Sequence, residues 1–413
     1  MKGGSLGLFE GYGIELEYMI ADSATLDVLP VADEVLRTAA GRYTTDFQAG
    51  SVSWSNELAL HVMEIKNTGP VPFLGGLAAP FQANITKING ILEKMGGRLM
   101  PSGMHPWMDP FKETQIWHRR NGRIYATYDR IFDCSNHGWS NIQSVHLNLP
   151  FDGDTEFGRL HAAVRLVMPL MPAVAASSPI VGGKISGLMD SRLHYYRINQ
   201  RMIPVISGRI VPEAVFTRAD YEDKILRKIY RAIERYDQQG VLAHDWLNSR
   251  GAIARFDRST IEIRMLDVQE CPLADLALAI SLTAVIRAMV DEHWCRYEEQ
   301  RGWQVRPLLK ILDATIRLGE RAVIDDPSYL RSFGVKTNPA TALQVWKHLE
   351  REVLRHHPSF EGAIASAMGV ILERGPLSRR ILRATGKRPG LTRLKTIYGK
   401  LCDCLMKGAM FFA

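Results

Sequence analysis

Four segments of this 413-residue chain alternate apolar residues with charged or metal-competent ones, which is the pattern of β-strands with two unlike faces. In each segment one face of the predicted sheet would be apolar and the other polar. Together the polar faces collect several carboxylates, a histidine and an arginine. The segments are Glu15-Leu16-Glu17, the stretch with Glu57 and Glu64, Ser144-Val145-His146-Leu147-Asn148, and Ile261-Glu262-Ile263-Arg264.

A sheet face with this many carboxylates cannot be an ordinary core, because burying an uncompensated charge costs too much free energy. Divalent cations bound together with a phosphate ligand would offset that cost. The four segments therefore predict a site for a metal ion and a nucleotide.

The order of the predicted elements indicates the fold class. Strand patterns lie in the first two thirds of the chain, at 11–20, 58–65 and 142–149 and, as a hairpin, at 251–256 and 260–266. Helical patterns occur at 72–95, 121–132, 186–202 and 217–239, and nearly everything after Pro272 is predicted as helix. Because strands and helices do not alternate regularly, we expect an α+β fold with a mostly antiparallel sheet and outer helices, and not a Rossmann fold or a barrel.

Composition and length favour one globular protein. We expect a single catalytic unit over 1–413, with a sheet-bearing core at 1–270 and a helical part at 271–413. Hydrophobic residues make up 46% and charged residues 23%, as in globular proteins. The apolar stretch 273–290 contains Asp275 and Arg287, so it is predicted as a buried helix and no membrane span is expected. Five irregularly spaced cysteines and the lack of a signal-peptide pattern favour a reduced, cytoplasmic protein.

The acidic residues can be weighed one by one. Glu15 and Glu17 are two apart, so both leave the same face of a strand and favour a hard cation such as Mg²⁺. A solvated strand face is the alternative. Glu64 alternates with apolar residues, so it is a partly buried acid that needs a partner. Glu57 lies at an odd offset from Glu64 and reaches the same site only if it precedes the strand or a bulge intervenes.

The other two polar faces carry a histidine and an arginine. His146 could bind a metal or donate to a phosphate oxygen, and structural hydrogen bonding is the alternative. Glu262 and Arg264 share a face, so a simple salt bridge would explain them. In the functional interpretation, Glu262 binds a metal and the fork of Arg264 contacts a transferring phosphoryl group. Each motif is weak alone, and their joint occurrence carries the prediction.

Several motifs occur in an order that resembles one family. They are Gly13-Ile14-Glu15-Leu16-Glu17-Tyr18, Asn56-Glu57-Leu58 followed by Glu64-Ile65, Gly103-Met104-His105-Pro106, Ser177-Ser178-Pro179 followed by Ser191-Arg192, and Thr260-Ile261-Glu262-Ile263-Arg264. The chain resembles the glutamate–cysteine ligase type 2 (carboxylate–amine ligase) family, which is related in fold to glutamine synthetase. The similarity covers residues 8–282 and is weaker beyond them, where only Leu377-Ser378-Arg379-Arg380 is similar.

The resemblance implies a curved antiparallel sheet whose concave face binds ATP and Mg²⁺. Arg264 would contact the γ-phosphate with Glu262 beside it, and Arg192 would bind the substrate carboxylate. The family often has H-x-H where this chain has Ser144-Val145-His146, which leaves the amine acceptor open. The implied metal ligands or their close neighbours are Glu15, Glu17, Glu57, Glu64, His146 and Glu262.

The chemistry expected of such a site is amide formation through an acyl phosphate, with the γ-carboxylate of glutamate as the acid. The acyl phosphate must be kept from water, so a mobile cover is expected. The glycine-rich segment 179–187 is the candidate cover, and Lys184 within it is the candidate nucleotide contact. Asp129 and Asp133 are further candidates, and His105-Pro106 is interpreted as fixing a turn.

Three other functions stay open. They are a phosphotransferase of the guanidino kinase type on the same sheet, a nucleic-acid-binding protein that uses the basic C-terminal segment, and a catalytically dead scaffold. The net charge is +7, and much of the basic excess lies near the C-terminus. Nucleic acid is disfavoured, because no stacking aromatics interleave with these basic residues. The expected partners are an amino-acid carboxylate and an amine, and a homo-oligomer is left open.

Overall fold

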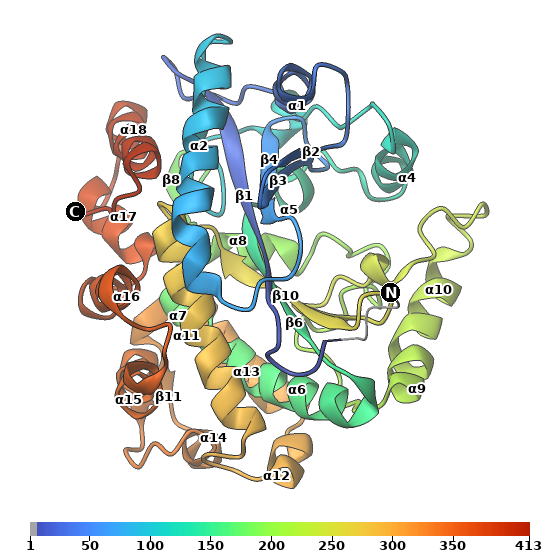
Figure 1. Ribbon diagram of the computed structural model, residues 1–413, viewed down its shortest axis with the longest axis vertical. Coiled ribbons are helices and arrows are strands. Elements are labelled where there is room, and N and C mark those ends of the chain that lie inside the picture. Colours follow the sequence, from blue (N-terminus) through green and yellow to red (C-terminus); the bar gives the residue numbers. More distant parts are fainter. Residues whose placement is uncertain (1–5) are drawn as a thin grey trace.

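The structure, a computed structural model, describes residues 6–413. At its centre is an eight-stranded sheet in the order β2-β3-β4-β1-β6-β10-β9, with β5 paired to β1 (Figure 1). Every pairing in this sheet is antiparallel. The strands are β1 (Gly13–Asp22), β2 (Asp46–Ala49), β3 (Val52–Asn56), β4 (Val62–Asn67), β5 (Gly97–Met100), β6 (Ser144–Pro150), β9 (Ala252–Arg255) and β10 (Thr260–Asp267).

Strand β1 lies in the middle of the sheet and separates its two faces. Ile14, Leu16 and Tyr18 are fully buried in the hydrophobic core. Glu15 and Glu17 leave the opposite face, because successive side chains alternate along a strand. One face of the sheet therefore belongs to the core, and the other is free to form a polar site.

Helices cover the apolar face. Helix α11 (Pro272–Val290) contacts α2 (Ala78–Glu93), α6 (Gly153–Val167) and α16 (Gly362–Arg374), and Figure 1 shows α2 alongside β1, with α11 below α2. By length and composition α11 could span a membrane, but 83% of its most apolar window is buried inside the fold. It is the one such helix among residues 6–413. The expectation of a buried core helix is confirmed.

Shorter helices lie on the other side of the sheet and around its edges. Figure 1 shows α4 and α10 on the side of the sheet away from α16 and α18. Four of these helices, α4, α5, α8 and the single turn at 245–247, supply walls for the polar face. The helices are α1 (Ala32–Ala40), α3 (Pro110–Glu113), α4 (Gly122–Phe132), α5 (His137–Ser140), α7 (Pro172–Ala175), α8 (Ser191–Tyr196), α9 (Arg218–Tyr221) and α10 (Arg227–Ile233).

The last third of the chain is helical, as predicted. Its short strands β11 (Val323–Ile324) and β12 (Ala340–Thr341) pair with each other. Several of its basic residues hold the helices in place: Arg380 forms a buried ion pair with Glu270, and Arg379 lies 2.7 Å from Glu320. The remaining helices are α12 (Tyr297–Gly302), α13 (Val305–Leu318), α14 (Pro327–Arg331), α15 (Ala342–Glu352), α17 (Leu377–Thr385) and α18 (Leu391–Lys407).

The structure confirms the α+β class with a mostly antiparallel sheet, but it corrects three elements. The helix expected at 186–202 is reduced to α8. The hairpin of β7 (Ile180–Val181) and β8 (Lys184–Ile185) precedes it, because Gly182 and Gly183 both adopt positive φ and close a two-residue turn. The helix expected at 217–239 ends at Ile233 and contains a π-helical turn, Glu222–Leu226. The strand expected at 58–65 begins only at Val62, and the short polar strands β2 and β3 were not predicted.

Candidate active site

The polar face of the sheet forms the floor of a cavity of about 600 Å³. Strands β1, β4, β6 and β10 provide the floor, and helices α4, α5 and α8 provide walls. Eight of the nine predicted site residues line this one cavity. They are Glu15, Glu17, Glu57, Glu64, His146, Arg192, Glu262 and Arg264.

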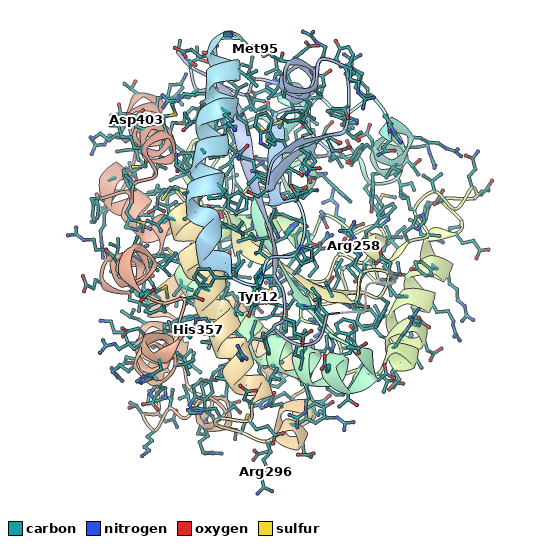
Figure 2. All side chains as sticks on the ribbon, viewed as in Figure 1. Tyr12, Met95, Arg258, Arg296, His357 and Asp403 are labelled. Carbon is teal, nitrogen blue, oxygen red and sulfur yellow. The ribbon has the colours of Figure 1, made fainter. Side chains whose placement is uncertain are left out.

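A second cavity of about 350 Å³ adjoins the first and shares Glu15, Lys66 and Arg258 with it. Arg258 is labelled in Figure 2, as is Tyr12, which also lines the second cavity. The two cavities meet beside the acidic residues. A ligand longer than a single cavity could therefore extend across the acids.

The register of the strands brings the predicted metal ligands together. Glu15 is opposite His146 of β6, and Glu17 is opposite Glu64 of β4. Glu57 lies between β3 and β4. It therefore precedes the strand that carries Glu64, as the odd spacing of the two residues required. Ligand atoms lie within 4.8 Å of one another in two groups that share Glu64: Glu15, Glu64 and His146, and Glu17, Glu57 and Glu64. Carboxylate oxygens with one imidazole fit a divalent cation.

His146 connects the acids of β1. Its Nδ1 atom lies 3.1 Å from Oε2 of Glu15, and its Nε2 atom lies 3.6 Å from Oε1 of Glu17. Ser144 donates from its backbone nitrogen and its hydroxyl to Oε2 of Glu17, at 2.7 and 2.9 Å. Asn148 donates to Oε1 of Glu15 at 3.2 Å. The polar face of β6 thus orients both carboxylates.

The pKa values show how crowded this cluster is. Burial raises the pKa of Glu57 well above its usual range, and the neighbouring carboxylates of Glu64 and Glu17 raise it further. Burial likewise raises the pKa of Glu17, although His146 opposes the shift. For Glu15, burial would raise the pKa, but the hydrogen bond and charge of His146, together with the charge of Lys66, lower it overall. Burial lowers the pKa of His146, but the adjacent Glu17 and Glu15 raise it overall. An added cation would relieve this repulsion.

Glu262 differs from the other acids because two arginines already contact it. Its Oε1 atom accepts from Nε of Arg264 at 2.5 Å, and its Oε2 atom accepts from Arg255 at 3.2 Å. Burial would raise its pKa, but Arg264, His146 and Arg255 lower it overall. Its Oε1 atom is 4.0 Å from Nδ1 of His146. Glu262 therefore lies beside the metal-competent groups and mainly holds Arg264 in the cavity.

Arg192 is almost completely buried at the edge of the cavity. Its Nε atom donates to Asp267 at 2.5 Å, and its Nη2 atom donates to the backbone oxygen of Arg264 at 3.2 Å. Ser178 also donates to Asp267, at 2.7 Å. The Ser-Ser-Pro and Ser-Arg motifs thus meet at Asp267, the last residue of β10. There Arg192 also hydrogen-bonds the backbone of Arg264.

Four other candidates lie outside the cavity. The structure does not bring Lys184 to the cavity: it is exposed on the β7–β8 hairpin, because the glycine turn directs that residue to solvent. Asp129 accepts a hydrogen bond from the backbone of Cys134, and Asp133 follows the end of α4. His105 donates from Nε2 to the Leu26 carbonyl at 2.9 Å and accepts the backbone N–H of Met108 at 3.0 Å. The prediction that His105 fixes a turn is confirmed.

Other site residues were missed. Lys66, which pairs with Glu64, continues the alternation of β4 and could have been found by extending the strand predicted at 58–65 by one residue. Arg255 faces Glu262 from β9. The aromatic residues of the walls come from helices and a turn, whose sequences carry no periodic sign of a site. They are Tyr125, Tyr128, Trp139, Tyr196 and Trp246.

The comparisons with known proteins agree with this geometry. Residues 12–396 match the profile of glutamate-cysteine ligase family 2 (GCS2). A protein of Archaeoglobus fulgidus, described as uncharacterized, is 37% identical over 280 residues, which is 68% of this chain and 75% of the relative.

Two solved structures share the fold. A glutamate–cysteine ligase from Francisella tularensis in complex with AMP is 12% identical, with a TM-score of 0.62 over 98% of this chain and 90% of that one. A bifunctional glutathione synthetase from Pasteurella multocida is 11% identical, with a TM-score of 0.54 over 95% of this chain. This chain spans 52% of the Pasteurella protein.

The family match, together with the fold, places the chain in the class of ATP-dependent ligases that form carbon–nitrogen bonds. Within that class, the chain belongs to glutamate-cysteine ligase family 2. The resemblance noted from the sequence motifs is confirmed.

Proposed function

We propose that this protein joins a carboxylic acid to an amine at the expense of ATP, through an acyl phosphate, with the γ-carboxylate of glutamate as the acid. The observation that carries the proposal is the convergence of five carboxylates, His146 and Arg264 in one cavity of about 600 Å³. The family assignment supports the use of ATP.

The acidic floor fits Mg²⁺. Glu15, Glu17, Glu57, Glu64 and His146 would hold the ion or ions, because hard oxygen donors suit this cation and two ligand groups share Glu64. Bound Mg²⁺ would neutralise the phosphate oxygens of ATP as negative charge develops on them. The chain's own contribution is to fix Glu15, Glu17 and Glu64 on adjacent strands of one sheet and Glu57 in the short connection between β3 and β4.

Arg264 would contact the γ-phosphate. Its Nε atom forms the ion pair with Glu262, so the fork is held in one orientation before ATP arrives. A planar guanidinium matches phosphate oxygens with two parallel hydrogen bonds. Arg192 would face the carboxylate of the acid substrate. Its Nε and Nη2 atoms are engaged by Asp267 and by Arg264, which leaves Nη1 for that contact.

The proposed reaction has two steps. A carboxylate oxygen attacks the γ-phosphorus of ATP, a new phosphorus–oxygen bond forms, and the bond to the β-phosphate oxygen breaks to release ADP. The amine nitrogen then attacks the acyl carbon, the bond from carbon to the phosphate oxygen breaks, and inorganic phosphate leaves with the amide as product. The amine loses its proton to solvent or to the departing phosphate. Keeping the cavity dry protects the acyl phosphate from hydrolysis.

The test is ADP release with Mg²⁺, ATP, glutamate and a panel of amines, followed by mass spectrometry of the product. We expect ADP release to require both an acid and an amine and the product mass to equal their sum minus water. ADP release with no dependence on an acid, together with a phosphorylated amine or guanidine, would show a phosphotransferase instead. A protein that fails to bind ATP at all would overturn the proposal.

A further inference from the structure

One wall of the cavity is aromatic. The ring of Tyr128 on α4 lies 5.1 Å from that of Trp139 on α5 and 6.0 Å from that of Trp246, between ring centres. Phe132 stacks on Trp139 at 5.4 Å. We call Tyr128, Trp139 and Trp246 the aromatic wall. All three line the cavity, although they come from three separate segments of the chain.

No arginine or lysine among residues 6–413 lies over the rings of the aromatic wall, although His244 stacks on one face of Trp246, with ring centres 5.2 Å apart. The arginines and lysines that lie over aromatic rings in residues 6–413 do so at other tyrosines, phenylalanines and tryptophans. The cations that line the cavity near its floor are paired with carboxylates instead: Arg264 with Glu262, and Lys66 with Glu64. The wall can therefore receive a cation from a ligand.

A buried acceptor lies beside the wall. Asn199 lines the cavity and is only 8% exposed. Its Nδ2 atom donates to the Gly138 carbonyl at 3.0 Å, and its backbone oxygen accepts from Nε1 of Trp139 at 3.2 Å. The Oδ1 atom has no hydrogen-bond partner among residues 6–413. A buried acceptor left unpaired costs free energy, and a donor on a ligand that reached it would remove that cost.

The packing around Gly138 fixes this acceptor in place. A Cβ atom at position 138 would come within 2.8 Å of the Asn199 Cβ and within 2.7 Å of the Tyr195 carbonyl oxygen. Only glycine lets α5 approach this closely. Asn199 and Trp139 are thereby held as one rigid unit on the wall.

These observations select the ligand chemistry. Aromatic faces are electron-rich, so they attract an ammonium group and disfavour a carboxylate. The free Oδ1 atom of Asn199 accepts an N–H and cannot donate. A carboxylate would find its partners on the floor, at Arg192 and Arg264. A purine would find room in the second cavity, beside the exposed ring of Pro70.

We propose that the aromatic wall and Asn199 bind the amine acceptor, and that this acceptor is a primary amine with an apolar or aromatic body and no carboxylate of its own. The inference rests on the proposed ligase function and names its second substrate class. It disfavours cysteine as the acceptor, because the floor arginines that could pair with its carboxylate are already assigned to the acid substrate and to the γ-phosphate.

A binding titration tests the inference without relying on turnover. Mg²⁺–ADP is added to the full chain, and tryptophan fluorescence is followed during titration with 2-phenylethylamine or with phenylalanine, which differs only by a carboxylate. We expect saturable quenching with an affinity for phenylethylamine about tenfold or more above that for phenylalanine. Equal affinities, or tighter binding of phenylalanine, would overturn the inference.

Two variants locate the binding. Trp246→Leu keeps apolar volume but removes a π face, so the affinity for phenylethylamine should fall about tenfold. Phe111→Ala, at a ring that is 75% exposed and outside the cavity, is the matched control and should bind as wild type. Wild-type affinity in Trp246→Leu would refute the role of the wall.

Steady-state ADP release separates the amine from the nucleotide. In Trp246→Leu the KM for the amine should rise about tenfold, while the KM for ATP changes less than about twofold. A rise in the KM for ATP alone would mean that adenine stacks on the wall and would overturn the inference. If no acid–amine pair releases ADP in the wild type, the proposed ligase function fails, and the fluorescence titration still decides whether the wall binds amines.

Discussion

Nδ1 of His146 lies 3.1 Å from Oε2 of Glu15, across the pair of strands β6 and β1. The same imidazole reaches Glu17 with its other nitrogen, at 3.6 Å. A single histidine therefore sits between two carboxylates that leave the same face of β1. A proton on this ring would partly compensate their charge, and a divalent cation could take over that role, because both ring and carboxylate atoms are potential ligands.

The crowding of Glu57 against Glu64 and Glu17 leads to a prediction about stability. Glu57→Gln removes a ligand charge and no packing, so the free energy of unfolding without Mg²⁺ should not fall. Wild type should gain about 2.7 kcal/mol when Mg²⁺ is present at 100 times its dissociation constant, and the variant should gain much less. Thermal unfolding with and without Mg²⁺ measures both effects. Glu298→Gln, an exposed acid on α12, is the control and should respond to Mg²⁺ like wild type.

Loss of a cluster carboxylate should also stop turnover. Glu15→Gln should abolish ADP release, since a neutral amide cannot replace a ligand charge, while far-UV circular dichroism stays that of wild type. Glu262→Gln should likewise lose activity, because Arg264 would lose the partner that orients it. Wild-type ADP production in Glu15→Gln would show that the metal assignment is wrong.

Arg264→Lys probes the proposed phosphate contact. An ammonium cannot reproduce two parallel hydrogen bonds, so kcat should fall about 10²–10³-fold, which corresponds to ~2.7–4 kcal/mol of lost transition-state stabilisation. The KM for ATP should change far less than kcat. Single-turnover kinetics with wild type and variant would measure this, and an unchanged kcat would refute the role.

Much of the site was readable from the sequence because β-strands have a fixed period of two. Glu15 with Glu17, and Glu262 with Arg264, had to share a face once their strands were recognised. The apolar residues between them lie on the opposite face of each strand, which packs against the core. The sequence does not predict how neighbouring strands are aligned. Only the structure shows that His146 on β6 lies opposite Glu15 on β1.

The walls of the cavity illustrate what the sequence could not provide. Trp139 and Trp246 lie on a four-residue helix and a single turn, and their positions depend on long-range packing. Asp267 was not singled out, although it holds Arg192 and accepts from Ser178. The glycine-rich segment 179–187 predicts a mobile cover that carries Lys184 to the nucleotide, but its glycine pair closes a hairpin outside the cavity.

The buried cysteines should be dispensable for catalysis. Burial raises the pKa of Cys402 to about 12 and that of Cys134 above its usual range, so neither thiol ionises near neutral pH and neither is a nucleophile. Cys134→Ser and Cys402→Ser should therefore keep wild-type kcat, with a lower melting temperature because a hydroxyl is less suited to an apolar site. ADP release and thermal unfolding report the two effects separately. A folded but inactive variant would reveal thiol chemistry.

His105 should make stability depend on pH in the acidic range. Burial lowers the pKa of its imidazole to about 4, whereas the unfolded chain has about 6.5. Between these values the unfolded state binds more protons, so His105 alone lowers the free energy of unfolding by about 1.4 kcal/mol per unit as the pH drops from 6.5 toward 4, and the buried His61 and His161, whose pKa values are also lowered, add to the slope. In His105→Gln this contribution disappears and the slope flattens, even though the variant is less stable because its hydrogen bonds to Leu26 and Met108 are disturbed. Urea unfolding at intervals of pH measures the slope. The exposed His293 provides the control, since His293→Gln should retain the slope of wild type, and a wild-type slope in His105→Gln would assign the acid sensitivity to another group.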